Sequence, residues 1–299
     1  MNETENTPPL DTIPLYRYLT FNRFLETLEK GLFIPKASLF NDRWEAMVHP
    51  MHEYLRERNA EKLLLRSRDE AKIPTLDDHN IPHISQSVYE GKKEVYVSCW
   101  NGTNYECVAM WKLYGKGGNA VMLETNAKEL TDAFVDFNES EKKEWLACLR
   151  KLKYVLPGDD GYNRVFDGDP PLWDNGFQGE LSTNYRFHYT YTGLHYKHIS
   201  YDFEHEYRLL AAHKNRGDRP NNGIILPLKK SFIKKVILKP DSSDTFKVKV
   251  RDCLNKYDFN DVEVEKSFLD ELPPLEKSWT ATFLKSTIRF LSDVLGFKS

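Results

Sequence analysis

The sequence predicts an α+β protein built on a central mixed or antiparallel sheet of short strands, with helical insertions. Three observations lead to this prediction. Short runs of β-branched and aromatic residues recur along the chain and are typical of strands. Segments with helical periodicity separate these runs. Hydrophobic residues make up 40% of the 299 residues and charged residues 29%, which is typical of a globular protein that buries a core.

The first predicted strand, residues 15–20, carries a single charge within an aromatic run. A helix is predicted over residues 21–30, because Phe24, Leu25 and Leu28 share one helical face, and Gly31 is expected to end it. Further strands are predicted at residues 32–34, 95–100, 120–124, 224–226, 233–238 and 262–264. Further helices are predicted at residues 104–114, 128–154 and 246–257.

The chain is expected to hold one α+β domain at residues 15–268, after a flexible tail at 1–14. Insertions are predicted at about 48–92 and 127–186, the second of which includes a long loop at 157–184 rich in Gly, Pro, Asp and Asn. A helical appendage is predicted at 269–299. Its apolar face would carry Phe283, Leu284, Ile288, Leu291, Val294 and Leu295. We expect such a helix to cap the core, to bind a partner or to lie on a membrane surface. The loop at 157–184 is a second candidate surface for binding a partner.

Composition limits the possible functions and location. The formal net charge of -3 gives no overall reason to expect a nucleic acid or an anionic membrane as partner. No apolar run approaches 18 residues, so no transmembrane segment is expected. The cysteines lack CxxC spacing and are interpreted as reduced thiols of a cytoplasmic protein. The histidines at 188, 195, 198 and 205 fit no standard ligand spacing, so no metal site is predicted.

The stretch at residues 201–210 is the main candidate site. As a strand, it places Glu204, Glu206 and Arg208 on one face, together with Asp202. Two carboxylates two residues apart on a strand lie within about 7 Å of each other. They are then close enough to share a ligand, or for the charge of one carboxylate to raise the pKa of the other. Two structural interpretations also stand: an exposed strand whose charges face water, or a helix with a Glu204–Arg208 pair.

Four motifs occur in a defined order over about residues 15–240. They are LYRYLT followed by a helix and GLF, then FNDRWE, then VYVSCW followed by MWKLYG and a strand, and finally FEHEYRLL. This order and spacing resemble family 2971 of the prokaryotic domains of unknown function. The resemblance implies a single α+β domain and no established activity. It also implies, for some members, an association with phage-defence genes.

Three of these motifs have a looser resemblance to ADP-ribosyltransferases of the Arg–Ser–Glu class, which use NAD as substrate. The resemblance implies that Arg17 steadies the NAD phosphate and ribose, and that Ser98 holds the nicotinamide-side ribose. Glu206 would support the oxocarbenium-like centre that forms as nicotinamide leaves. Glu204 would be the first carboxylate of the Glu-x-Glu pair that prepares an acceptor. As an alternative, Arg17 is a structural arginine paired with Glu45 or Glu206.

The residue types suit this chemistry. A carboxylate beside the positively charged ribose stabilises the transition state most, and the forked guanidinium of arginine matches a pyrophosphate. One departure is that the usual Ser-Thr-Ser motif is here Ser98-Cys99-Trp100, which keeps one hydroxyl. Five aromatic residues are expected to bind the cofactor by packing against its flat nicotinamide or adenine ring: Tyr16, Tyr18, Trp100, Trp111 and Tyr114.

The leading hypothesis is therefore NAD-dependent ADP-ribosyl transfer or NAD hydrolysis, with a protein, a nucleic acid or water as acceptor. The second is a non-catalytic binding or sensor module of a defence system, in which Glu204, Glu206 and Arg208 form an ion-pair network. The loop at 157–184 and the C-terminal helix would then recognise a partner. The third is a metal-dependent hydrolase or nuclease that uses Asp202 with the two glutamates, although no lysine or aspartate motif at nuclease spacing accompanies them.

Overall fold

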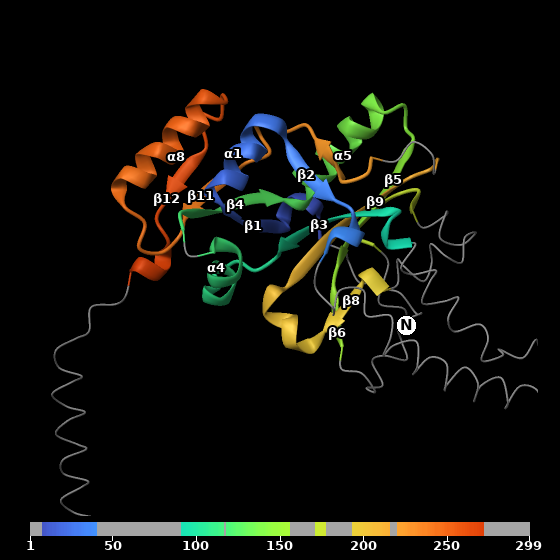
Figure 1. The fold of residues 1–299 in the computed structure, drawn as a ribbon, viewed down its shortest axis with the longest axis horizontal. Coiled ribbons are helices and arrows are strands. Elements are labelled where there is room, and N and C mark those ends of the chain that lie inside the picture. Colours follow the sequence, from blue (N-terminus) through green and yellow to red (C-terminus); the bar gives the residue numbers. More distant parts are fainter. Residues whose placement is uncertain are drawn as a thin grey trace, which may run out of the picture.

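The computed structural model describes residues 8–40, 91–116, 118–155, 171–177, 193–215 and 220–271. Most of the FNDRWE motif, nearly all of the predicted insertion at 48–92 and all but the first three residues of the C-terminal appendage lie outside these ranges. Figure 1 shows a central sheet with helices on both sides. The prediction of an α+β protein with a mixed sheet is confirmed.

The main sheet has eight strands among the described residues, in the order β12-β11-β4-β1-β3-β9-β5-β7. Neighbouring strands run antiparallel, except that β11 and β12 are parallel. The strands are β1 (Pro14–Thr20), β3 (Val95–Asn101), β4 (Ala120–Asn126), β5 (Trp145–Lys151), β7 (Trp173–Asn175), β9 (Glu206–His213), β11 (Lys235–Leu238) and β12 (Glu263–Glu265). Two small two-stranded sheets pair β2 (Leu32–Pro35) with β10 (Gly223–Leu226), and β6 (Lys153–Val155) with β8 (Tyr196–His198).

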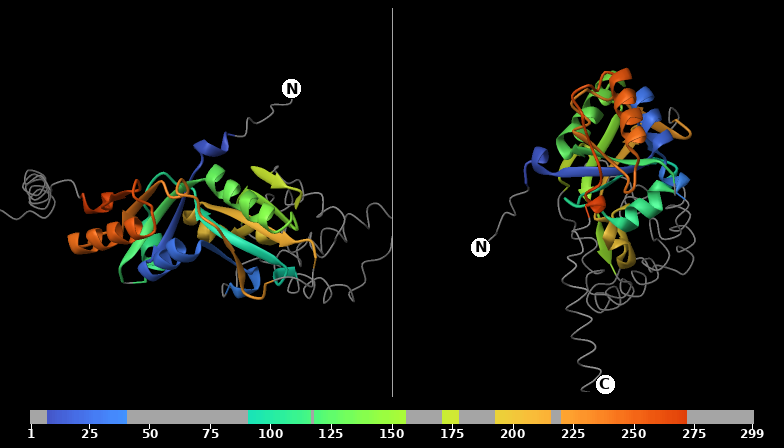
Figure 2. Two further views of the ribbon diagram at one scale, coloured as in Figure 1. Left: turned by 90° about the horizontal axis from the view of Figure 1, so that it is seen from above. Right: turned by 90° about the vertical axis from the view of Figure 1, so that its left-hand side faces the viewer.

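The helices divide between the two faces of the sheet, as Figures 1 and 2 show. One face, here called the three-helix face, is covered by α1 (Phe21–Lys30), α5 (Ala127–Ser140) and α8 (Asp244–Lys256), whose apolar residues join the largest core cluster. The other face, the α4 face, packs against α4 (Val108–Gly115). Two smaller apolar clusters lie on the α4 face, one around Trp111 and one around Leu210.

Local sequence signals explain where α1 begins and ends. The side chain of Thr20 accepts a hydrogen bond from the backbone N–H of Arg23, as an N-cap residue does. Gly31 follows the helix with φ 105°, a conformation that residues with a Cβ rarely adopt. A Cβ at Gly31 would also lie 2.3 Å from the carbonyl oxygen of Leu226. The same kind of N-cap is made by Asn126 for α5 and by Ser243 for α8.

The prediction of an insertion at 127–186 is wrong, because β5 is an interior strand of the main sheet, between β9 and β7. Residues 145–149 of β5 are all buried, so the run shows no alternation of polar and apolar residues that would reveal a strand. The predicted loop at 157–184 contains β7, and its remaining residues lie mostly outside the described ranges. The predicted helix at 104–114 begins later, at Val108.

The N-terminal boundary also differs from the prediction. The 3-10 helix η1 (Leu10–Thr12) and the buried residue Ile13 precede β1, so the folded chain begins before residue 14. None of the helices in the described ranges is long and apolar enough to cross a membrane. The four cysteines are free thiols.

Candidate functional site

The candidate stretch at 201–210 changes conformation in its middle, so the prediction of a continuous strand is wrong. Residues Ile199–Glu204 form a 3-10 helix, η5, and β9 begins only at Glu206. Between them His205 adopts a left-handed conformation with φ 40°. The end of β3 holds this turn, because Asn101 Nδ2 donates to the Glu204 carbonyl at 2.6 Å. The N–H of Gly102 donates to the carbonyl of His205 at 3.0 Å.

Gly102 is needed for the close approach of the chain at this turn. A Cβ at this position would lie 2.1 Å from Cε2 of the Tyr207 ring, which is closer than atoms can approach. The turn therefore depends on a residue without a side chain as well as on the two hydrogen bonds from β3.

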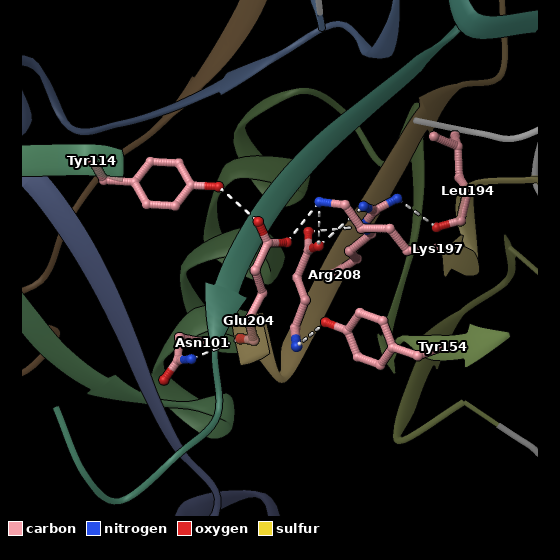
Figure 3. Close-up of polar contacts among 8 residues, drawn as sticks. Asn101, Tyr114, Tyr154, Leu194, Lys197, Glu204 and Arg208 are labelled. Atoms are coloured by element: carbon pink, nitrogen blue, oxygen red, sulfur yellow. Dashed lines mark hydrogen bonds and ion pairs between the residues drawn. The ribbon is translucent and has the colours of Figure 1, made fainter. Parts of the chain in front are cut away.

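Both glutamates are buried in a cluster of four charged side chains, here called the charged cluster: Lys197, Glu204, Glu206 and Arg208. Arg208 binds Glu206 through two hydrogen bonds, Nε to Oε1 at 2.8 Å and Nη2 to Oε2 at 3.0 Å. Lys197 Nζ lies 2.6 Å from Glu204 Oε2 and 3.7 Å from Glu206 Oε2. Lys197 therefore links the two carboxylates, as Figure 3 shows.

Neighbouring groups complete the hydrogen bonding of the charged cluster. The hydroxyl of Tyr114 donates to Glu204 Oε1 at 3.2 Å, and Arg208 Nη1 donates to the carbonyl of Leu194 at 2.8 Å. The hydroxyl of Tyr154 accepts from the backbone N–H of Glu206 at 2.9 Å. In Figure 3 the two tyrosines approach the cluster from opposite sides. All four carboxylate oxygens consequently accept hydrogen bonds from groups of the chain.

The two carboxyl groups have opposite pKa shifts. Burial would raise the pKa of Glu206, but Arg208, Lys197 and the thiol of Cys99 together hold it below its ordinary value. Burial raises the pKa of Glu204, the attraction of Lys197 opposes this effect, and the charge of Glu206 adds to it. Glu206 is therefore the firmly ionised member of the pair, and Glu204 is the one that takes up a proton more readily.

The strand registers divide the predicted site residues between the two faces of the sheet. Asn101 lies opposite both Tyr16 on β1 and Glu206 on β9, so these three side chains point to the α4 face. Successive residues of a strand alternate between faces. Arg17 and Ser98 therefore point to the three-helix face. The sheet separates them from Glu206, so the expected Arg17–Ser98–Glu206 constellation does not assemble.

Arg17 has other neighbours on its own face. Its Nη1 lies 3.5 Å from Ser98 Oγ, and its guanidinium carbon lies 5.6 Å from the centre of the Trp100 ring. Trp100 Nε1 donates to Ser98 Oγ at 2.9 Å. Burial lowers the pKa of Arg17. The proposed pairing of Arg17 with Glu206 is wrong, because Arg208 occupies Glu206. The other suggested partner, Glu45, lies outside the described ranges.

The predicted aromatic residues are mostly used in packing. Trp100 is buried on the three-helix face. Tyr18 and Trp111 are buried on the α4 face, where their rings meet edge to face with centroids 4.8 Å apart. The Tyr18 hydroxyl accepts from the N–H of Cys107 at 3.0 Å. Tyr16 packs beside this pair. These rings attach α4 to the sheet, and of the five predicted residues Tyr114 contacts the charged cluster directly.

The charged cluster offers no metal site of the expected kind. Among the residues that the structure describes, no three His, Cys, Asp or Glu side chains gather as ligands. Asp202, which the metal-dependent hypothesis pairs with the glutamates, is exposed on η5, whereas both glutamates are buried. Each glutamate is already bound by a cation of the protein.

The sequence interpretation missed Lys197, Tyr154 and Asn101. They come from β8, β6 and β3, and no local pattern connects these segments with the glutamates. The pairing of Glu206 with Arg208 could be found, because residues two apart on a strand share a face. Comparisons with protein-family models, curated proteins and solved structures gave no match for this chain.

Proposed function

We propose that this chain is a non-catalytic binding or sensor module, in which the charged cluster holds η5, β8 and β9 together beneath α4. The support is that every carboxylate oxygen of Glu204 and Glu206 accepts a hydrogen bond from the chain itself. A catalytic carboxylate needs an oxygen directed at the substrate. Glu206 is moreover neutralised by a bidentate arginine, which weakens its effect on any developing positive charge.

The charged cluster has a structural use in this proposal. A buried ion pair contributes little net stability, because both charges lose their hydration, but removing one partner is strongly unfavourable. Lys197, on β8, therefore cannot leave Glu204 and Glu206 without leaving a charge buried. The cluster thus favours one arrangement of the short elements that form this edge of the α4 face. Partner recognition by the loop at 157–184 is part of the proposal, although most of that loop lies outside the described ranges.

A second candidate function is cleavage of NAD at the same carboxylates, and the opposite pKa shifts of Glu204 and Glu206 favour it. Two carboxyl groups whose environments separate their pKa values are the usual arrangement for an acid and a base. Here Glu204 would exchange a proton with the acceptor, and ionised Glu206 would face the ribose. The NAD pyrophosphate would require a cation other than Arg17, which points to the opposite face.

The family and setting of the protein remain proposals as well. The order of the four sequence motifs supports placing the chain with family 2971 of the domains of unknown function, and an ADP-ribosyltransferase-like fold belongs to the second candidate only. A cytoplasmic role in phage defence rests on the same motifs and on the reduced cysteines.

An assay for nicotinamide release separates the two candidates. Wild type, Glu206→Gln and Glu204→Gln are incubated with NAD, and released nicotinamide is measured by chromatography. Glu106→Gln is the matched control, because Glu106 is also a buried glutamate but lies outside the charged cluster, bound to Trp111 and Ser267. The binding-module proposal expects no release by any of the four proteins and no stabilisation by NAD. Release by wild type and Glu106→Gln that both cluster variants lose would overturn it.

A further inference from the structure

Arg17 is a half-buried arginine in apolar surroundings on the three-helix face of the sheet. Leu123 lies directly opposite it on β4, and Leu15 lies two residues before it on the same side of β1. Both leucines are at most 1% exposed, and so is Trp100, whose ring lies against the guanidinium. A charged group in such surroundings is rare unless an opposite charge accompanies it.

No carboxylate of the described residues forms an ion pair with Arg17. Its two close polar or aromatic neighbours are neutral: the Ser98 hydroxyl, 3.5 Å from Nη1, and the Trp100 ring, whose centre is 5.6 Å from the guanidinium carbon. Ser98 Oγ also accepts a shorter hydrogen bond from Trp100 Nε1, at 2.9 Å. Burial lowers the pKa of Arg17, and the charge of Arg23 on α1 lowers it further. The positive charge of Arg17 is therefore balanced by no carboxylate in the described part of the chain.

The edge of the guanidinium formed by Nε and Nη2 remains open to a ligand. Unlike Nη1, neither of these two nitrogens has a hydrogen-bond acceptor among the described residues. Neither belongs to the side-chain atoms of the described chain that are both buried and without a hydrogen-bond partner, so both are reached by solvent. This edge presents two parallel N–H donors, which match two oxygens of a single oxyanion.

We propose that Arg17 binds the carboxylate of a small organic ligand through Nε and Nη2. A carboxylate is planar, like the guanidinium fork, and carries the single negative charge that balances one arginine. The pair is stronger here than in bulk water, because apolar side chains keep solvent from part of the guanidinium. The same apolar side chains suit the organic part of the ligand. The site lies on the opposite face of the sheet from the charged cluster, so this inference goes beyond the proposed function and can fail without it.

Urea unfolding of the full chain at constant ionic strength tests the proposal, with sodium acetate and sodium benzoate as probes and sodium chloride as the reference salt. Both carboxylates are expected to raise the unfolding midpoint saturably, which gives their Kd. Arg17→Met is expected to raise that Kd at least about tenfold, and Arg17→Lys, which keeps the charge but loses the fork, at least about threefold. Arg23→Met is the matched control, because Arg23 is an exposed arginine already bound to Glu26, and it is expected to change the Kd less than about twofold.

Nuclear magnetic resonance of the arginine Nε–H groups provides a second measurement, made on the wild-type protein alone. The Arg17 Nε–H signal is expected to shift as acetate is added, while the Arg23 signal stays in place. An unchanged Arg17 signal, or no stabilisation beyond that of chloride, would overturn the proposal. So would equal Kd values for wild type and Arg17→Met, which indicate binding elsewhere. Tighter binding of inorganic phosphate than of either carboxylate would overturn the choice of a carboxylate as ligand.

Discussion

Replacing Arg208 with methionine is expected to destabilise the protein more than any change to a surface ion pair. Arg208 is 1% exposed and is the bidentate partner of Glu206. Without it, the cation left beside Glu206 is Lys197, 3.7 Å away and already bound to Glu204 at 2.6 Å, and the other polar neighbour is the neutral thiol of Cys99. The carbonyl of Leu194 also loses its donor. Removing one partner of a buried pair costs about 3–5 kcal/mol, and that loss is expected here.

The assay is urea unfolding near pH 7, followed by far-ultraviolet circular dichroism. Arg23→Met is the control, because the side chains of Arg23 and Glu26 are 65% and 51% exposed and such a pair contributes less than about 1 kcal/mol. The double variant Arg208→Met/Glu206→Leu is expected to recover most of the loss, since it removes the buried charge together with its partner.

Two results would refute this reasoning. If Arg208→Met lost no more stability than Arg23→Met, Glu206 would not depend on Arg208 for its charge. If the double variant Arg208→Met/Glu206→Leu were less stable than Arg208→Met alone, the loss would come from packing or from Leu194 and not from an unpaired carboxylate. The double variant also answers the question if Arg208→Met alone does not fold.

Three further predictions concern the same region. In a double-mutant cycle, Arg17→Met and Glu206→Gln should change the unfolding free energy additively, within about 0.5 kcal/mol, because the sheet separates them; a larger coupling contradicts the register. Thermal unfolding should show that Gly102→Ala lowers the unfolding free energy by about 1–3 kcal/mol, because the new Cβ would overlap the Tyr207 ring. The control Gly118→Ala should lower it by less than about 1 kcal/mol, because a Cβ there meets open space. Equal losses for the two variants would contradict the close contact between Gly102 and Tyr207. The third prediction concerns pH. Burial raises the pKa of Glu204 in the folded protein. The stability that this shift contributes is therefore fully present below the unfolded pKa of Glu204 and is lost as the pH rises through its folded pKa. Wild type should therefore lose stability relative to Glu204→Gln as the pH rises, measured by urea unfolding, and the opposite trend would be inconsistent with the raised pKa.

Local sequence patterns were enough to predict many of the individual elements. The strand at 15–20, the helix at 21–30 and the strand at 95–100 match β1, α1 and β3 to within one residue at each end. Their signals involve residues close together in the chain: runs of β-branched and aromatic residues, helical spacing and the glycine at 31. The shared face of Glu206 and Arg208 is local in the same sense, because it depends only on the period of two along a strand.

Elements without a local signal were misread. In β5 both faces are covered, so its buried run from Trp145 to Leu149 lacks the alternation that marks a half-buried strand. The left-handed His205 divides the predicted strand at 201–210 into η5 and β9. That turn is held by hydrogen bonds from Asn101 and Gly102, about a hundred residues away in the chain.

The sequence by itself thus determined the secondary elements and the charged residue types, while the tertiary structure decided which of those residues meet. Whether Arg17 and Glu206 share a face depends on the registers of β1 with β3 and of β3 with β9. A shift of one residue in either register would reverse the result, because side chains alternate strictly between the two faces of a sheet. The partnership of Lys197 with Glu204 likewise depends on β8 packing beside η5 beneath α4. Register and packing are set by contacts between distant segments, which no short stretch of sequence contains.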